Sequence, residues 1–225
     1  MPISIPVYLE VGSKRVFVAA VEWPGWCRAG RNEDDALKAL VAYGQRYVRA
    51  LGPAGRGLHL PNEASGLKVV ERLKGNATTE FGAPGIPPSS DAKPVAGADL
   101  TRLETLLTAC WAAFDAAAHR ASSAVLSKGP RGGGRDLDAI VGHVLGADAA
   151  YLSGLGGPYH APAGAKAMQQ LRHDFLEILR ARAGGEVPVI SSRRRSALWT
   201  PRYAVRRSAW HALDHAWEIE DRASP

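Results

Sequence analysis

The chain has 225 residues, of which 46% are hydrophobic and 22% charged, values typical of a globular protein rather than a disordered chain. Its net charge of +6 comes mostly from arginine, and no aromatic-interleaved basic motif accompanies it, so nucleic acid is not the expected partner. There is neither a membrane-spanning apolar run nor a signal-like leader, which predicts a cytoplasmic protein with no membrane partner.

The first third of the chain has the pattern of a small α+β unit. Apolar and polar residues alternate over Ile3–Val11, and a tight turn leads to a second apolar strand over Arg15–Val21. A short extended piece after Pro24 and Gly25 precedes a helix over Asn32–Leu51, whose first turn is acidic. With a further strand over Leu67–Leu73, residues 1–75 form a predicted β-β-α-β domain.

Residues 76–98 are rich in proline and glycine and carry no periodic apolar pattern. Such composition is typical of a linker, so we place the domain boundary here.

From residue 99 the spacing of apolar residues changes to three and four, which is the period of an amphipathic helix. Four such helices are predicted, starting at Asp99, Asp136, Ala163 and Thr200, the first of them followed by a Gly-rich loop. Residues 99–225 therefore form a predicted all-α four-helix bundle, the second domain of an α+β chain. Facing helices of such bundles are a common location for metal sites.

Three histidines lie at the edges of the apolar faces of these helices. His211 and His215 are one helical turn apart on the last helix, and His143 has the same relation to the second. Three imidazoles suffice for a catalytic-type metal site with an open position. The alternative is that they are unlinked histidines at the edge of a core.

Other residues on the apolar faces also carry predictions. Asp148 falls within the apolar stripe of the second helix and should be paired or hydrogen-bonded. Trp210 and Trp217 form a separate stripe on the last helix, which suggests packing against the first domain or against a second copy in a homodimer. Cys27 and Cys110 are the two cysteines, and we expect each to be a buried free thiol.

The second domain resembles the DinB/YfiT-like superfamily of four-helix metalloproteins. The resemblance rests on the first helix with its Gly-rich loop, on the stretch Asp138–Leu145 that contains His143, and on the His-x-x-x-His of residues 211–215. It covers roughly residues 99–222. It implies that His143, His211 and His215 are the metal ligands.

The same resemblance implies a chemistry. Characterised relatives include transferases and isomerases that use low-molecular-weight thiols, and other members have no known activity. A divalent ion held by three neutral imidazoles, Zn²⁺ or else Ni²⁺, Mn²⁺ or Fe²⁺, can activate a thiol or water. Asp214 precedes His215 by one residue, and Glu218 lies one helical turn after it. Glu218 and Asp214 are therefore candidate catalytic or supporting carboxylates. A basic set could orient an anionic small-molecule substrate: Arg202, Arg206 and Arg207.

The first domain resembles the HicB-like fold of antitoxin-type proteins. The likeness rests on the paired strands, on the segment from Pro24 to Gly30 and on the acidic helix start from Asn32, although Trp26 interrupts the family's Pro-Gly-Cys.

Taken with the resemblance of the second domain, a metal-dependent thiol transferase is the favoured function. A metal-assisted hydrolase and a non-catalytic regulatory protein that binds a partner through the HicB-like domain are the alternatives.

Overall fold

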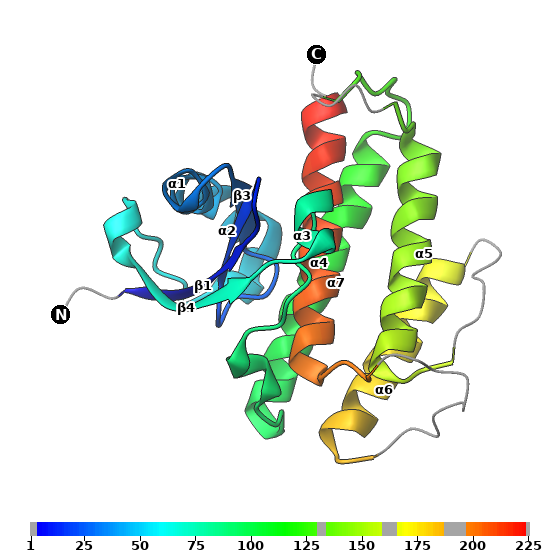
Figure 1. Cartoon of the computed structure of the whole chain (residues 1–225). Coiled ribbons are helices and arrows are strands. Elements are labelled where there is room, and N and C mark those ends of the chain that lie inside the picture. The colour runs from blue at the N-terminus through cyan, green and yellow to red at the C-terminus, as the bar shows by residue number, and fades with distance from the viewer. Residues whose placement is uncertain (1–3, 130–133, 159–165, 187–196, 224–225) are drawn as a thin grey trace. The chain divides into compact units, whose positions relative to one another are not determined.

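The computed structural model describes residues 4–129, 134–158, 166–186 and 197–223 (Figure 1). The chain divides into two compact units, Met1–Lys93 and Pro94–Pro225. A four-stranded mixed sheet in the first unit is followed by several helices, which confirms the α+β class. Within the described part of the chain, no helix combines the length and the apolarity needed to cross a membrane.

The sheet has the strand order β3-β2-β1-β4. β1 (Ile5–Val11) and β2 (Val16–Ala20) form an antiparallel hairpin, and β4 (Leu67–Lys74) runs parallel to β1. The extended piece after Pro24 is the edge strand β3 (Cys27–Gly30), which pairs antiparallel with β2. The predicted β-β-α-β order therefore omits one strand, because four residues are too few to show a period of two.

The helix predicted over Asn32–Leu51 is two helices, α1 (Glu33–Ala42) and α2 (Gly44–Leu51). Asn32 caps α1 as predicted, since its side chain accepts a hydrogen bond from the amide of Asp35 at 2.8 Å. α1 packs on β2 and β3.

Trp26, which interrupts the Pro-Gly-Cys pattern, is an anchor between β3 and the helices. It is fully buried, its indole N–H donates to the carbonyl of Leu40 at 2.9 Å, and its ring stacks on Tyr47 at 5.7 Å between centroids. The Tyr47 hydroxyl donates in turn to the carbonyl of Pro24 at 2.8 Å. The turn at Pro24 is thus fixed by the core, and both hydrogen bonds satisfy buried polar groups.

Residues 76–98, which the composition predicts to be a linker, contain regular structure. They contain the short helix α3 (Ala77–Phe81) and a 3₁₀ turn at Ser89–Ala92, and the division between the two units falls after Lys93. The reason is Glu10 on β1, a fully buried carboxylate.

Glu10 binds this segment through both of its oxygens. They accept hydrogen bonds from the Thr79 hydroxyl and from the amides of Gly85 and Ile86, the latter two at 2.9–3.0 Å. A buried carboxylate needs such donors, and here a segment distant in sequence supplies them. The segment therefore belongs to the first unit.

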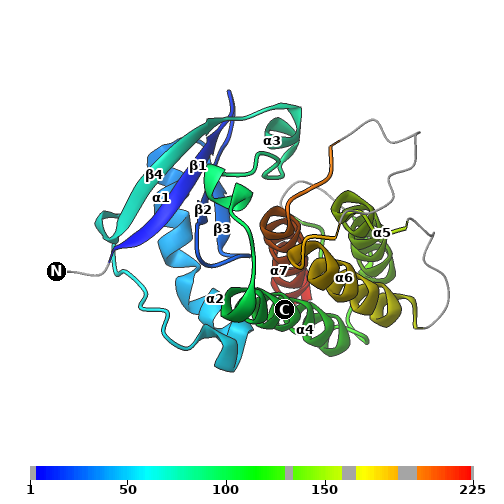
Figure 2. The ribbon, with the colours of Figure 1, turned by 90° about the horizontal axis from the view of Figure 1, so that it is seen from below.

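In the described residues of the second unit, four long helices pack on one another (Figure 2). α7 contacts the other three helices, and α5 contacts α6. Three predicted features lie outside the described residues: the start of the first strand at Ile3, the start of the third long helix at Ala163, and residues 130–133 of the Gly-rich loop. The helices are α4 (Gly97–Arg120), α5 (Leu137–Leu155), α6 (Ala167–Ala183) and α7 (Pro201–Ala223).

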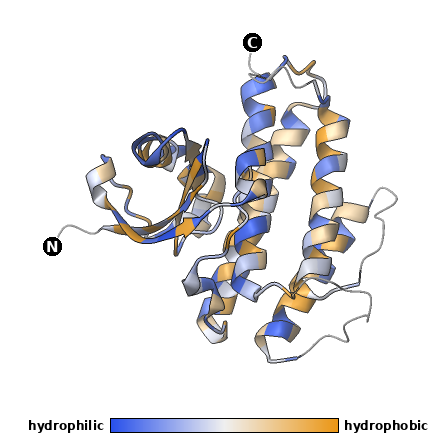
Figure 3. Ribbon diagram, in the orientation of Figure 1, coloured by the Kyte–Doolittle hydropathy of each residue, from blue (hydrophilic) through white to orange (hydrophobic). Residues whose placement is uncertain are grey.

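α7 is unusual because it is buried along its length yet carries many polar residues. Figure 3 shows hydrophilic segments along α7, whereas α5 is coloured largely hydrophobic. Polar side chains are rarely buried without a partner, so the inward-facing polar residues of α7 indicate either a network or a site. Its buried polar residues are Arg206, Ser208, His211, His215 and Arg222.

Candidate metal centre

The three predicted histidines converge between α5 and α7. Thr200 caps α7 by accepting from the amide of Tyr203 at 3.2 Å, and the uninterrupted helix then places His211 and His215 one turn apart. α5 packs on α7 and brings His143 to them. One ligand atom from each of the three residues lies within 4.8 Å of those of the other two, which confirms the predicted convergence.

Two features of this cluster fit a metal ion. The Nε2 atoms of His143 and His211 face each other at 3.2 Å, close to the separation of about 3.3 Å that two nitrogens of a tetrahedral zinc site have. In addition, Nδ1 of His211 is buried and has no hydrogen-bond partner among the described residues. A buried ring nitrogen without a partner is costly in a core, and coordination by that nitrogen would offset the cost.

The electrostatics of the cluster also favour metal binding. Burial, followed by the charges of His215 and His143, lowers the pKa of His211 to about 2. The pKa of His143 is lowered as well, first by its partial burial and then by His215. Imidazole coordinates a metal only in its neutral form, so these two ligands need not lose a proton when the ion binds.

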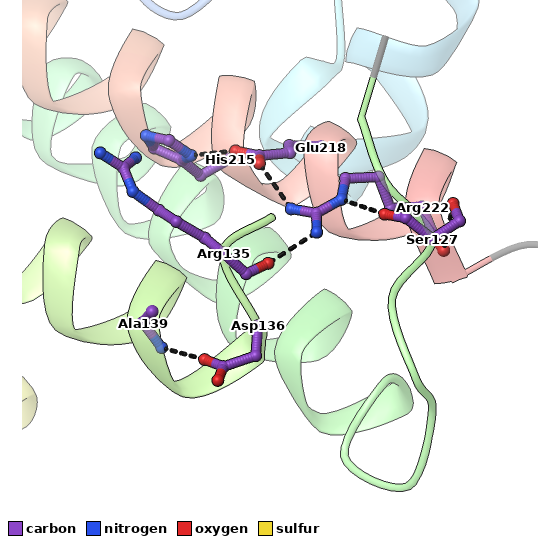
Figure 4. Close-up of polar contacts among 7 residues, drawn as sticks. All are labelled: Ser127, Arg135, Asp136, Ala139, His215, Glu218 and Arg222. Carbon is purple, nitrogen blue, oxygen red and sulfur yellow. Dashed lines mark hydrogen bonds and ion pairs between the residues drawn. The ribbon is translucent and has the colours of Figure 1, made fainter. Parts of the chain in front are cut away.

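Glu218 orients one of the candidate ligands. Its Oε2 lies 2.7 Å from Nδ1 of His215 (Figure 4). If this Nδ1 carries the proton, the other ring nitrogen, Nε2, is left free to coordinate. A carboxylate that accepts from the second nitrogen of a ligand histidine is a recurring support of zinc sites, because it fixes the tautomer and the ring orientation.

Arg222 holds this carboxylate in turn. Its guanidinium, nearly fully buried, donates to Oε1 of Glu218 at 2.8 Å, to the carbonyl of Ser127 at 2.7 Å and to the carbonyl of Arg135 at 2.6 Å (Figure 4). The hydrogen bond with His215, followed by the interaction with Arg222, lowers the pKa of Glu218 to about 2. Glu218 is therefore ionised, and it is a positioning residue for His215 rather than a free base.

The other predicted carboxylate, Asp214, is half-buried on α7 and is not among the converging ligand groups. The three predicted substrate-binding arginines are separated by the fold. Arg202 pairs with Asp99 and donates to the carbonyl of Pro94 at 3.2 Å, at the start of α4. Arg206 is buried.

Arg207 is the member of that basic set that acts on the histidine cluster. Its guanidinium lies over the rings of Trp210 at 4.7 Å and Tyr151 at 5.6 Å, and the Tyr151 ring is 5.6 Å from that of His211. The positive charge of Arg207 is one of the causes, after burial and the other histidines, that lower the pKa of His211.

Arg222 and Arg135 also lie at this site and were not predicted from the sequence. Arg222 lies four residues after Glu218 on one helix, a spacing that favours an ion pair and could have been noticed. Arg135 gives no such signal, because it follows a Gly-rich loop and is brought to the site by its contact with Arg222.

A second polar network lies in the interior of the same unit. The Trp111 indole N–H donates to the Ser208 hydroxyl at 3.1 Å, and this hydroxyl donates to Oδ1 of Asp148 at 3.2 Å. Asp148 is thus hydrogen-bonded as predicted, although its Oδ2 has no partner among the described residues. Burial raises the pKa of Asp148 to about 7, and the charge of Arg172 opposes this shift.

Comparisons with known proteins add no relative to these observations: no family model, no curated protein and no solved structure matches the chain. What the fold and the site define is therefore an α+β chain with three clustered histidines that could hold a metal ion.

The role assigned to Glu218 predicts the behaviour of two glutamine variants. Glu218→Gln should weaken Zn²⁺ affinity by about 10- to 100-fold without unfolding the protein, because the acceptor that orients His215 loses its charge. Glu220→Gln, on the same helix and in an ion pair with Arg120, should leave the affinity within about twofold of the wild type. Competition with a chromophoric chelator measures both, and equal affinities would contradict the role of Glu218.

The burial of Asp148 predicts an unusual dependence of stability on pH. A free aspartate has a pKa of about 3.9, so between this value and about 7 the folded state holds a proton that the unfolded state has lost. This carboxyl should therefore lower the free energy of unfolding as pH rises from about 4 to 7, by up to about 1.4 kcal/mol per pH unit.

Asp148→Asn removes this titration, so the stability of the wild type relative to the variant should decline over that range. Urea denaturation with EDTA present, at several pH values, gives the difference. Asp138→Asn, at an exposed position in the first turn of α5, is the control and should give a difference that does not change with pH. A flat difference for Asp148→Asn would show that this carboxyl does not titrate there.

Proposed function

We propose that the chain is a divalent-metal enzyme in which His143, His211 and His215 hold the ion, on a four-helix bundle of the DinB-like type. The observation that carries the proposal is the convergence of three imidazoles from two packed helices, one of them hydrogen-bonded to a carboxylate. Its favoured reaction uses a low-molecular-weight thiol on a small-molecule substrate.

The packing of α4 to α7 supports the bundle assignment. α7 contacts each of the other three helices, and ligands that project from facing helices into the interior are the usual way in which bundles hold metals. The first unit, with its sheet order β3-β2-β1-β4, is the part proposed to be HicB-like.

Zn²⁺ is the ion that this donor set suits best. Three neutral nitrogen ligands, with no carboxylate in the cluster among the described residues, favour a borderline ion such as Zn²⁺ over the hard ions, while Ni²⁺, Mn²⁺ and Fe²⁺ remain alternatives. When bound, such an ion supplies Lewis-acid activation of a thiol or of water.

The residues of the chain have more limited tasks. Glu218 and Arg222 keep the ring of His215 oriented. The burial of Trp210, Ala212 and Ala216 beside the ligands restricts water around the interior side of the site.

The thiol of the proposed reaction has to come from outside the chain. Cys27 and Cys110 are both buried free thiols, as predicted. Burial raises the pKa of Cys110 well above its usual range, so it does not form a thiolate near neutral pH. A soluble thiol, with a pKa of about 8.5, becomes a nucleophile more easily than water does.

A metal-assisted hydrolase is the weaker enzymatic reading. Water activation usually needs a base near the ion. Among the described residues, Glu218 is the one carboxylate that hydrogen-bonds the cluster, and it is already engaged by His215 and Arg222.

The thiol proposal predicts a spectroscopic result. Co²⁺-loaded protein should gain a sulfur-to-metal charge-transfer band when a low-molecular-weight thiol such as 2-mercaptoethanol is added, because Co²⁺ reports direct sulfur ligation. His215→Ala should show a much weaker band, since it removes one of the three ligands. His173→Ala, on α6 and outside the cluster, should behave as the wild type does.

A Co²⁺ spectrum that no thiol changes, in protein that has bound the ion, would contradict the thiol reaction. It would favour hydrolysis or a non-catalytic role in which the first unit binds a partner.

A further inference from the structure

Arg135 is an exposed arginine fixed beside the histidine cluster by its backbone. Its carbonyl accepts from Nη2 of Arg222 at 2.6 Å, and the next residue, Asp136, caps α5 by accepting from the amide of Ala139 at 2.8 Å. With the backbone held at both points, the side chain extends toward the ring of His215 (Figure 4).

The charge of Arg135 acts on the site. It contributes to the lowered pKa of His143, after burial and His215, and it contributes in the same direction to that of His211. A cation at this position opposes both the protonation of the histidines and the binding of a metal cation. A positive group beside a cation site is therefore unfavourable unless something negative is placed between them.

Several other arginines of the second unit are matched by carboxylates. Arg222 binds Glu218, Arg202 binds Asp99 and Arg172 binds Asp115. By contrast, the guanidinium of Arg135 makes no hydrogen bond or ion pair with any of the described residues. An arginine whose backbone is held in place, and whose accessible side chain extends toward His215 without an acceptor among the described residues, is suited to receive an anion.

We propose that Arg135 is a specificity residue that binds an anionic oxygen group, carboxylate or phosphate, of the molecule that reaches the open position of the metal. The inference rests on the proposed function, since it names the substrate class of that site. The planar guanidinium can donate two parallel hydrogen bonds to two oxygens of such a group.

Arg207 adds positive potential from the α7 side. Stacking over Trp210 and Tyr151 holds its guanidinium in place, and its charge lowers the pKa of His211 after burial and the other histidines. The only carboxylate hydrogen-bonded to the described cluster, Glu218, is neutralised by Arg222. The surroundings of the ligands therefore favour a molecule with at least one negative group in addition to the atom that reaches the metal.

The experiment compares three anions on Co²⁺-loaded, full-length protein by visible spectroscopy. Acetate offers one anionic group, succinate adds a second carboxylate and phosphonoacetate adds a phosphonate. In the wild type, at least one of the two larger probes should bind about 10-fold more tightly than acetate, and which one does so distinguishes a carboxylate from a phosphate partner.

Arg135→Gln, compared with the wild type at equal Co²⁺ loading, should reduce this preference to about twofold or less. Arg135→Lys keeps the charge but not the fork and should retain part of the preference. Lys128→Gln removes one positive charge at another exposed position and should retain all of it.

The possible outcomes distinguish a failure of this inference from a failure of the proposed metal site. Wild-type protein that takes up no Co²⁺ overturns the metal site and this inference together. Normal Co²⁺ uptake with no preference for either larger probe, or with a preference that survives in Arg135→Gln, overturns the role of Arg135 alone.

Discussion

The guanidinium of Arg222 is the group on which the geometry of the site depends. It is buried near the end of α7, and its donors reach three segments: Glu218 on its own helix, the carbonyl of Ser127 and the carbonyl of Arg135. A buried guanidinium is stable only when its donors are satisfied, so these contacts have to form together. The backbone before α5 and the orientation of His215 are consequently set by one residue.

Burial determines the protonation of the interior groups. In His211 it disfavours the imidazolium and prepares a ligand, whereas in Asp148 it disfavours the carboxylate and favours a neutral acid. Both effects reduce buried charge, yet they act oppositely on the dependence of stability on pH. α7 thus carries buried polar groups where a purely structural helix would be apolar, which costs stability and indicates a candidate site.

The sequence predicted the convergence of the three histidines better than it predicted the strands of the first unit. An i,i+4 pair and a third histidine at the edge of another apolar face suffice to bring His143, His211 and His215 together, because helical geometry is local and periodic. The α+β class follows from the two periods of the apolar residues, two in the strands and about 3.6 in the helices. The assignments to the DinB-like and HicB-like families stay predictions.

The features that were missed depend on contacts between distant residues. β3 has too few residues to show a period and exists because β2 pairs with it. The segment 76–98 looked like a linker because its order comes from Glu10, more than sixty residues away in the chain. Arg135 reaches the site through Arg222. The composition and periodicity of a sequence carry no information about such long-range hydrogen bonds.

The most direct test is the metal content of the purified protein and of single-histidine variants, measured by inductively coupled plasma mass spectrometry after equilibration with Zn²⁺ and gel filtration. The wild type should retain about one ion per chain, because three convergent imidazoles suffice for such a site. His143→Ala should lose most of it, whereas His119→Ala, near the end of α4 and outside the cluster, should not. Equal metal content in the wild type and in His143→Ala would contradict the three-histidine site.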